Sequence, residues 1–212
     1  MTKRQLMTLY RRLYRSYGPQ NWWPADAPFE VMVGAVLTQN TAWTNVEKAI
    51  AGLHRAGKLD PHRIRRMRAD TLARLIRPSG YFNIKARRLQ NLCRWYLAAG
   101  GHAGLESLAT AELRRRLLSV NGVGPETADD ILLYAFGRPV FVIDAYTRRL
   151  LRTLDLIDGT EHYETLRELF ETRLQPDPAL FNEYHALIVR HAKEPCSGDR
   201  GCRHCRVEAP LR

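Results

Sequence analysis

The clearest structural signal in this chain is the stretch LLSVNGVGPETA, residues 117–128. It predicts that one helix ends near Leu118, that the backbone turns tightly through Gly122 and Gly124, and that Pro125 begins a new helix. The amides of such a turn face outward beside a helix N-terminus, so the turn can bind a phosphate oxygen. A helical corner without a ligand is the alternative, and the Leu-x-x-Val before the turn and Thr-Ala after it favour the phosphate site.

The rest of the chain also predicts helices. Apolar residues recur at three- and four-residue spacing, and long alternating runs of β-branched residues are missing. Four residues that cap helix starts precede such segments: Asp26, Asp60, Thr110 and Thr160. The segment PVFVID, residues 139–144, resembles a strand but has no second strand to pair with, so we interpret it as an extended connector. The predicted class is all-α, with about ten helices.

Composition narrows the class of protein. The 212 residues include 33 Lys and Arg against 22 Asp and Glu, which gives a formal charge of +11, and 45% are hydrophobic. Such a chain can bury a core in one or two domains, and its composition excludes a disordered or fibrous protein. No apolar run reaches the ~20 residues that cross a bilayer, and the basic N-terminus lacks the apolar core of a secretory signal. The positive charge makes a polyanion the expected partner.

A second informative stretch, VIDAYTRRL, covers residues 142–150. Asp144 follows an apolar segment and opens a helix, where an aspartate is ordinarily an N-cap. A carboxylate beside a phosphate-binding turn can also stabilise positive charge on a sugar or activate a water molecule. The residues alone leave the cap and the catalyst as alternatives.

Together these stretches resemble the helix-hairpin-helix DNA glycosylase superfamily typified by endonuclease III, and most of all its 3-methyladenine DNA glycosylase III branch. Four blocks carry the resemblance in the expected order: WWP (22–24), GAVLTQNT (34–41), RPSGYFN (77–83) and GVGPETA (122–128). The resemblance implies a two-lobed helical fold with the active site in the cleft between the lobes. One lobe would be residues 22–134, and the other would combine residues 1–21 with residues 135–212.

The resemblance also implies the reaction. Bifunctional members carry a lysine two residues after the last hairpin glycine, and its amine forms a Schiff base with the sugar before the strand is cut. Here that position is Glu126, and a carboxylate cannot form an imine. A monofunctional enzyme is therefore implied, which hydrolyses the N-glycosidic bond and leaves an abasic site. Asp144 aligns with the essential aspartate and would stabilise the oxocarbenium-like sugar and orient water.

A base pocket follows from the same resemblance, because a nucleotide must leave the duplex stack before its glycosidic bond can be reached. Trp22 and Trp43 match the aromatic pair that sandwiches the base, Tyr81 would line the pocket, and Glu126 would face the base. Gln39 matches the residue that fills the gap in the DNA. Electron-rich rings attract cationic bases, so alkylated purines such as 3-methyladenine are the expected substrates. Tryptophans as core anchors and a glutamate that only complements the helix dipole are the alternatives.

Contacts with double-stranded DNA that holds a damaged base are expected from the hairpin and from two basic helices. These are the residues concerned: Asn121, Gly122, Val123, Gly124 and Thr127 of the hairpin, Arg148, and Lys85, Arg87 and Arg88. The expected setting is a monomer in the cytoplasm of a bacterial-type cell, associated with the nucleoid and with no membrane.

Three of the four cysteines, Cys196, Cys202 and Cys205, lie close together near the C-terminus, which indicates a metal site rather than a disulfide scaffold. They resemble the iron–sulfur loop of endonuclease III, C-x6-C-x2-C-x5-C. The first gap is one residue shorter here, and Leu211 stands where the fourth cysteine is expected. Cys93 aligns with a position that is not a ligand.

The metal that such a loop would hold stays open among three alternatives. These are a [4Fe–4S] cluster with a fourth ligand other than cysteine, a Zn²⁺ ion completed by His204 or His191, and a loop without metal. In each case the role would be structural, and the loop would present Arg200, Arg203 and Arg206 to DNA.

Two other functions also stay open. Related monofunctional enzymes with similar cores remove mispaired uracil or thymine, and others act on oxidised pyrimidines. A catalytically silent protein that only binds DNA damage belongs to a different class. Asp144 argues against that last function, because a pure binding protein needs the hairpin but no carboxylate at this position.

Overall fold

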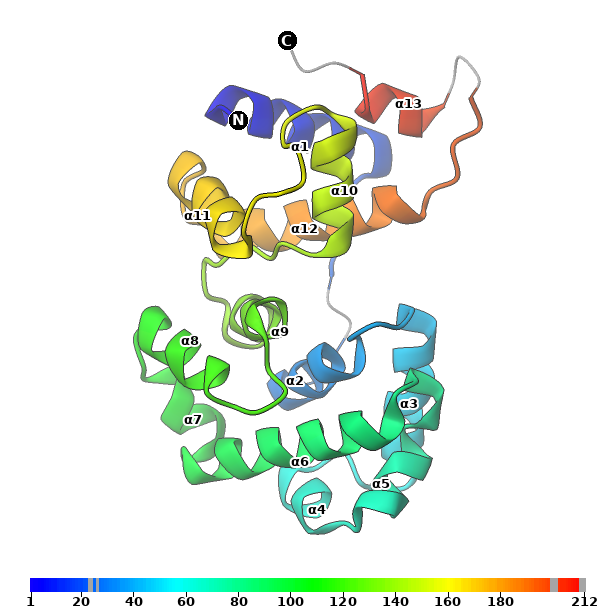
Figure 1. The fold of residues 1–212 in the computed structure, drawn as a ribbon, viewed down its shortest axis with the longest axis vertical. Coiled ribbons are helices and arrows are strands. Elements are labelled where there is room, and N and C mark those ends of the chain that lie inside the picture. Colours follow the sequence, from blue (N-terminus) through cyan, green and yellow to red (C-terminus); the bar gives the residue numbers. More distant parts are fainter. Residues whose placement is uncertain (23–24, 26, 199–201, 210–212) are drawn as a thin grey trace. The chain divides into compact units, whose positions relative to one another are not determined.

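The computed structural model describes residues 1–22, 25, 27–198 and 202–209, and the expectations for Trp23, Asp26 and Arg200 lie outside these residues. Every regular element within the described ranges is a helix (Figure 1). The predicted all-α class is therefore confirmed, and residues 139–144 form an extended connector without helical or strand structure. In the same ranges, no helix has both the length and the apolar character needed to cross a membrane.

The chain divides into two compact units. One unit combines Met1–Pro24 with Gly137–Arg212, and the other is Ala25–Phe136. The two ends of the chain therefore belong to the same unit. These boundaries lie two or three residues from those that the resemblance implies.

The unit Ala25–Phe136 is built around α2 (Pro28–Leu37). Eight of the ten residues of α2 are buried, and it contacts α3, α6, α9 and the π-helical turn η2. A helix that is apolar on all sides is stable only when neighbours cover it completely. The other elements of this unit are α3 (Trp43–Arg55), α4 (Pro61–Arg66), α5 (Ala69–Leu75), η1 (Arg77–Ser79), α6 (Phe82–Ala98), α7 (Gly101–Glu106), α8 (Thr110–Leu118), α9 (Pro125–Asp130) and η2 (Ile131–Ala135).

The second unit is built around α12 (Pro178–Lys193), which contacts α1 and α10. Its other helices are α1 (Lys3–Tyr17), α10 (Ala145–Thr153), α11 (Tyr163–Arg173) and α13 (Arg203–Val207). Phe141 of the connector stacks on Phe170 of α11 with ring centroids 3.9 Å apart. The connector residues 140–143 are all buried, and this burial fixes the point at which α10 begins.

The observed helix starts confirm some of the predicted caps and correct others. Asp60 caps α4, since its carboxylate accepts the amide of Arg63 at 2.8 Å. Thr110 is the first residue of α8 rather than its cap. The helix expected after Thr160 begins later, at Tyr163, because Asp158 binds the amide and the hydroxyl of Thr160 at 3.1 and 2.7 Å.

The expected DNA contact of Lys85 on α6 is wrong. Its side chain is 1% exposed and does not face solvent. Its ammonium group donates to the carbonyl of Leu37 at 2.8 Å and to that of Ser79 at 2.6 Å. The last carbonyls of a helix have no partner within it, so Lys85 completes the C-terminus of α2. Burial, with a smaller effect of Arg88, lowers the pKa of Lys85 to about 8.

Replacing Lys85 by methionine tests this role. The carbonyls of Leu37 and Ser79 would lose their donor inside the unit, so the free energy of unfolding should fall by about 1–3 kcal/mol. The pKa of Lys85 is lower in the folded chain than in the unfolded one. The wild type should therefore gain stability relative to Lys85→Met as the pH rises from about 8 to about 10.

Urea unfolding at both pH values measures the two effects. Lys58→Met, at an exposed position, is the matched control and should behave as the wild type does. A Lys85→Met variant with an unchanged midpoint at every pH would contradict the structural role of Lys85.

Candidate active site

The hairpin between α8 and α9 contains two glycines, and only the first of them is required by the fold. Gly122 has a φ of +98°, and a Cβ atom there would lie 2.3 Å from Cγ of Arg88. The fold itself therefore requires glycine at position 122. Gly124 has an extended backbone, with φ −92° and ψ 179°, and no heavy atom lies within 4 Å of the position of a Cβ. The folded chain has room for a larger residue at Gly124.

Gln39, two residues after the end of α2, is bound to this hairpin. Its amide nitrogen donates to the carbonyl of Gly122 at 3.1 Å and to the hydroxyl of Thr127 at 2.8 Å. The guanidinium group of Arg88 donates to the side-chain oxygen of Gln39. Arg88 thus supports the hairpin from α6, where the sequence led us to expect a DNA contact.

The expected DNA-binding residues of the hairpin fall into two groups by exposure. Asn121 and Gly124 are exposed, and Asn91 of α6 donates to the carbonyl of Asn121 at 3.1 Å. Val123 and Thr127 are buried. Their side chains therefore support the turn, and the amide of Val123 donates to the carbonyl of Val120 at 3.0 Å within it.

The expected pocket residues of the same unit lie at helix starts. Trp43 is the first residue of α3 and donates from its indole nitrogen to Glu47 at 2.9 Å. Tyr81 precedes α6 with a φ of +44°, a conformation that is rare for a large side chain, and it is 67% exposed. Glu126 is exposed in the first turn of α9, where its charge complements the helix dipole.

Asp144, in the other unit, is the N-cap of α10 as expected. Its Oδ1 accepts the amide of Thr147 at 2.7 Å, and its Oδ2 lies 3.5 Å from Nε2 of His185 on α12. Its side chain is 13% exposed. Burial on its own raises the pKa of Asp144, but His185 and the amide of Thr147 together hold the pKa below its usual value. The carboxylate is therefore ionised at neutral pH.

His185 is a site residue that the sequence analysis missed. It stands directly before the apolar run ALIV of α12, and 41 positions separate it from Asp144. An isolated histidine of this kind carries no pattern in the sequence that distinguishes it from a histidine of the core.

Two other expected site residues of this unit have partners within it. The ring of Trp22 is half-buried, and the ammonium group of Lys193 lies 5.6 Å from its centroid. The ammonium group of Lys193 therefore makes a cation–π contact with this ring. The guanidinium group of Arg148 donates to the carbonyl of Glu161 at 2.9 Å.

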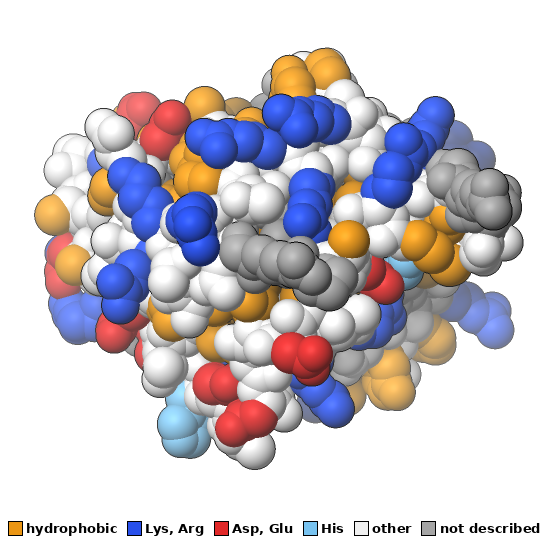
Figure 2. All heavy atoms as spheres, turned by 90° about the horizontal axis from the view of Figure 1, so that it is seen from above, with side chains coloured by type: hydrophobic (Ala, Val, Ile, Leu, Met, Phe, Trp, Pro, Cys, Tyr) orange, Lys and Arg blue, Asp and Glu red, His pale blue; other side chains and the backbone are white. Residues whose placement is uncertain are grey.

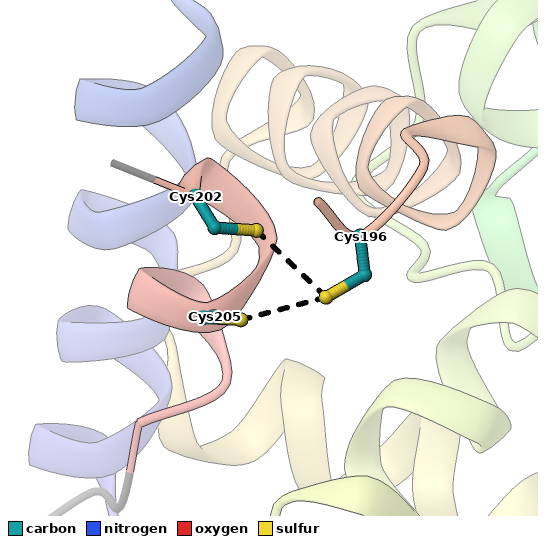
Figure 3. A group of neighbouring side chains, drawn as sticks. All are labelled: Cys196, Cys202 and Cys205. Atoms are coloured by element: carbon teal, nitrogen blue, oxygen red, sulfur yellow. Dashed lines mark hydrogen bonds between the residues drawn. The ribbon is translucent and has the colours of Figure 1, made fainter. Parts of the chain in front are cut away.

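Cys196, Cys202 and Cys205 gather at the C-terminal end of this unit (Figure 3). Sγ of Cys196 lies 3.8 Å from that of Cys202 and 3.4 Å from that of Cys205. Sulfurs bound at about 2.3 Å to one tetrahedral ion stand about 3.8 Å apart. In a [4Fe–4S] cluster each cysteine binds a different iron, which separates the sulfurs further. The observed separations are close to those of ligands of a single ion.

The two histidines considered as a fourth ligand are grouped with a carboxylate instead. Nε2 of His191 lies 3.3 Å from Glu208, and Nδ1 of His204 lies 3.4 Å from the other oxygen of Glu208. The hydroxyl of Tyr17 lies 2.9 Å from Nδ1 of His191. Within the described ranges, the group of possible ligands around Cys196 comprises the three cysteines.

Basic side chains gather on the face of this unit that α1 and α13 occupy (Figure 2). A hollow of about 400 Å³ there is lined by Arg12, Arg15, Ser16, Arg203 and Arg206. The guanidinium group of Arg12 donates to the carbonyl of Ala209, which attaches the segment after α13 to α1. The arrangement can bind a polyanion.

Comparison with known proteins identifies the family. Residues 33–176 match the family described as HhH-GPD superfamily base excision DNA repair protein. A Methanocaldococcus jannaschii protein with the provisional name DNA repair glycosylase MJ1434 is 44% identical over 94% of this chain and 92% of its own length.

Two solved structures show the same fold. The H. pylori 3-methyladenine DNA glycosylase MagIII, bound to 1,N6-ethenoadenine, has a TM-score of 0.77 and 29% identity and covers 91% of this chain and 98% of its own. A non-covalent complex of endonuclease III with DNA has a TM-score of 0.80 and 20% identity, covers 100% of this chain and 96% of its own, and shows the fold. The chain therefore belongs to the HhH-GPD superfamily of base excision DNA repair proteins and is an endonuclease III-like DNA glycosylase.

Proposed function

We propose that this glycosylase is monofunctional, hydrolyses the N-glycosidic bond of alkylated purines such as 3-methyladenine, and leaves an abasic site. The observation that carries the proposal is the ionised, mostly buried carboxylate of Asp144 at the start of α10. The proposed substrate is double-stranded DNA, and the enzyme would act as a monomer in the cytoplasm at the nucleoid. The related H. pylori enzyme, named for 3-methyladenine, supports the choice of base.

Asp144 would act on the sugar. As the glycosidic bond breaks, positive charge develops at C1′, and a fixed anion stabilises that charge without having to reorganise. The same carboxylate can accept a proton from the attacking water. A purine methylated at N3 or N7 leaves as a neutral base, so the reaction needs no strong acid on the leaving group. One carboxylate is therefore sufficient for the proposed hydrolysis.

The absence of strand cleavage rests on the position of the amines. Glu126 stands where bifunctional relatives carry the lysine that forms the Schiff base. Lys85 is the lysine whose pKa is lowered to about 8, which would favour a nucleophilic amine. Its amine is buried and donates to two carbonyls, so it is structural. Both observations support hydrolysis without a lyase step.

The proposal assigns the flipped base to aromatic side chains. Trp22, Trp43 and Tyr81 would provide its stacking surfaces, and Glu126 would face its polar edge. Stacking favours a cationic base by about 1 kcal/mol or more over a neutral one. The contact between Lys193 and the ring of Trp22 is an example of the same interaction within this chain.

We also propose that the three cysteines hold one thiophilic ion, such as Zn²⁺. The ion would connect Cys196 to Cys202 and Cys205 and so hold α13, which carries Arg203 and Arg206, in its place beside α1. No step of base removal depends on it.

Base release from defined duplexes tests the proposed reaction. Duplexes with 3-methyladenine or 7-methylguanine should lose the base, and the strand should break only after hot alkali. Asp144→Asn should lower the rate by on the order of 10²–10³-fold, because the amide cannot balance the cationic sugar. Its affinity for abasic-site DNA should stay unchanged.

The same assay separates the alternatives. Release from G·U, G·T or oxidised pyrimidine duplexes in place of alkylated ones would identify a different glycosylase. Strand cleavage without alkali would contradict the interpretation of Glu126, and binding without release from any duplex would favour the damage-binding protein. Full activity of Asp144→Asn would remove Asp144 from the mechanism.

Gly124→Ala tests the hairpin as a phosphate site. A methyl group fits the extended backbone, so the thermal midpoint should be unchanged, but it would occupy the space that a phosphate needs. The Kd for an abasic-site duplex should rise about ten-fold, the equivalent of one net hydrogen bond to a charged group. Fluorescence anisotropy with a labelled duplex measures this change.

Gly122→Ala is the matched control for the hairpin. It should lower the thermal midpoint, because position 122 is left-handed and closely covered by Arg88. An unchanged DNA affinity of Gly124→Ala would exclude the hairpin from the phosphate contact.

Metal analysis tests the cysteine site. Protein purified without oxygen from cells supplied with iron and zinc should contain about one zinc ion per chain and no acid-labile sulfide. Cys205→Ser should lose the metal. Cys93→Ala, a buried cysteine of the other unit, should keep it. A visible iron–sulfur absorption with about four irons per chain would contradict the single ion.

A further inference from the structure

His185 lies next to the carboxylate of Asp144, but the proposed reaction does not yet assign it a role. It lies on α12, its side chain is 6% exposed, and its Nε2 stands 3.5 Å from Oδ2 of Asp144. Thr147 donates to the other oxygen, Oδ1, at 2.7 Å. The two oxygens of one carboxylate are thus approached from two different helices.

We infer that His185 is a positioning residue for Asp144, holding the second carboxylate oxygen so that the group stays oriented and charged during base removal. The inference rests on the proposed function of Asp144. It adds to that function a second residue, which acts through the carboxylate and does not touch the substrate.

The geometry shows why a second contact is needed. The bond from Thr147 is an ordinary capping bond, and it fixes one oxygen only. A carboxylate held at one oxygen can still turn about its last torsion, which is broad for aspartate. A donor at the other oxygen fixes the plane of the group. Catalytic hydrogen bonds are often long in the unliganded enzyme and shorten in the complex, which is consistent with the separation of 3.5 Å.

The charges around the pair support the assignment to His185. On α10, Arg148 donates to the carbonyl of Glu161 and Arg149 donates to the carbonyl of Ala192. On α12, the hydroxyl of Tyr184 donates to the carbonyl of Leu6 on α1. His185 is the titratable group that most lowers the pKa of the buried carboxylate. Its removal should therefore favour the protonated, inactive form of Asp144.

A comparison of His185→Phe, His185→Gln and Asp144→Asn separates positioning from packing. Phenylalanine keeps the ring volume but has no donor, whereas glutamine keeps a donor of similar reach. His185→Phe should lower kcat by on the order of ten-fold or more, with KM nearly unchanged. The acid limb of its pH–rate profile should move to higher pH. His185→Gln should recover part of the rate.

The double variant His185→Phe, Asp144→Asn gives the decisive readout. If His185 acts through the carboxylate, its replacement should change nothing further once residue 144 is asparagine. Additive losses would show that His185 only supports packing and would overturn the inference. So would a wild-type rate and pH profile in His185→Phe.

The experiments also distinguish a wrong role for His185 from a wrong role for Asp144. A fully active Asp144→Asn would refute the role of Asp144 itself, whatever the His185 variants do. Thermal melting and affinity for abasic-site DNA establish that each variant is folded. If His185→Phe does not fold, an unchanged pH profile of His185→Gln overturns the inference, and a profile moved to higher pH supports it.

Discussion

The candidate site depends on keeping one carboxylate both charged and mostly buried. Burial disfavours an ionised Asp144, so the fold must supply groups that stabilise the anion. Two such groups are present, the amide of Thr147 and the imidazole of His185. The buried connector 140–143 fixes where α10 starts, and thereby where the carboxylate stands. Helix capping and the proposed chemistry are therefore served by the same group of atoms.

The hairpin has a different structural requirement, because a turn that binds phosphate through its backbone must be held rigid by contacts elsewhere. Gly122 is enclosed by Arg88, and Gln39 connects the turn to the end of α2. These contacts stabilise the turn at Gly122 and leave the space at Gly124 open. The division between a glycine required by the fold and a glycine with free space around it indicates where a ligand has room to approach.

Local signals made most of the fold predictable, and long-range contacts made part of the site unpredictable. Asp144 caps its helix through a residue three positions away, so the sequence reveals it. Thr160 does not cap a helix because its hydroxyl is bound to nearby Asp158. Lys85 binds a carbonyl 48 positions away, and a basic pattern on α6 looks the same whether a charge points outward or inward. The contact of His185 with Asp144 spans 41 positions and has no sequence signature.

Family membership determines the reaction more firmly than it determines the metal. The family match covers residues 33–176 and so places the chain among the glycosylases without the C-terminal loop. The loop has a shorter first gap than the iron–sulfur pattern, and its three sulfurs are as close as ligands of one ion. A structural ion in this loop would contribute by positioning the arginines of α13 and would take no part in the reaction at the sugar. Its chemical identity could therefore differ between relatives without affecting catalysis, as long as α13 stays in contact with α1.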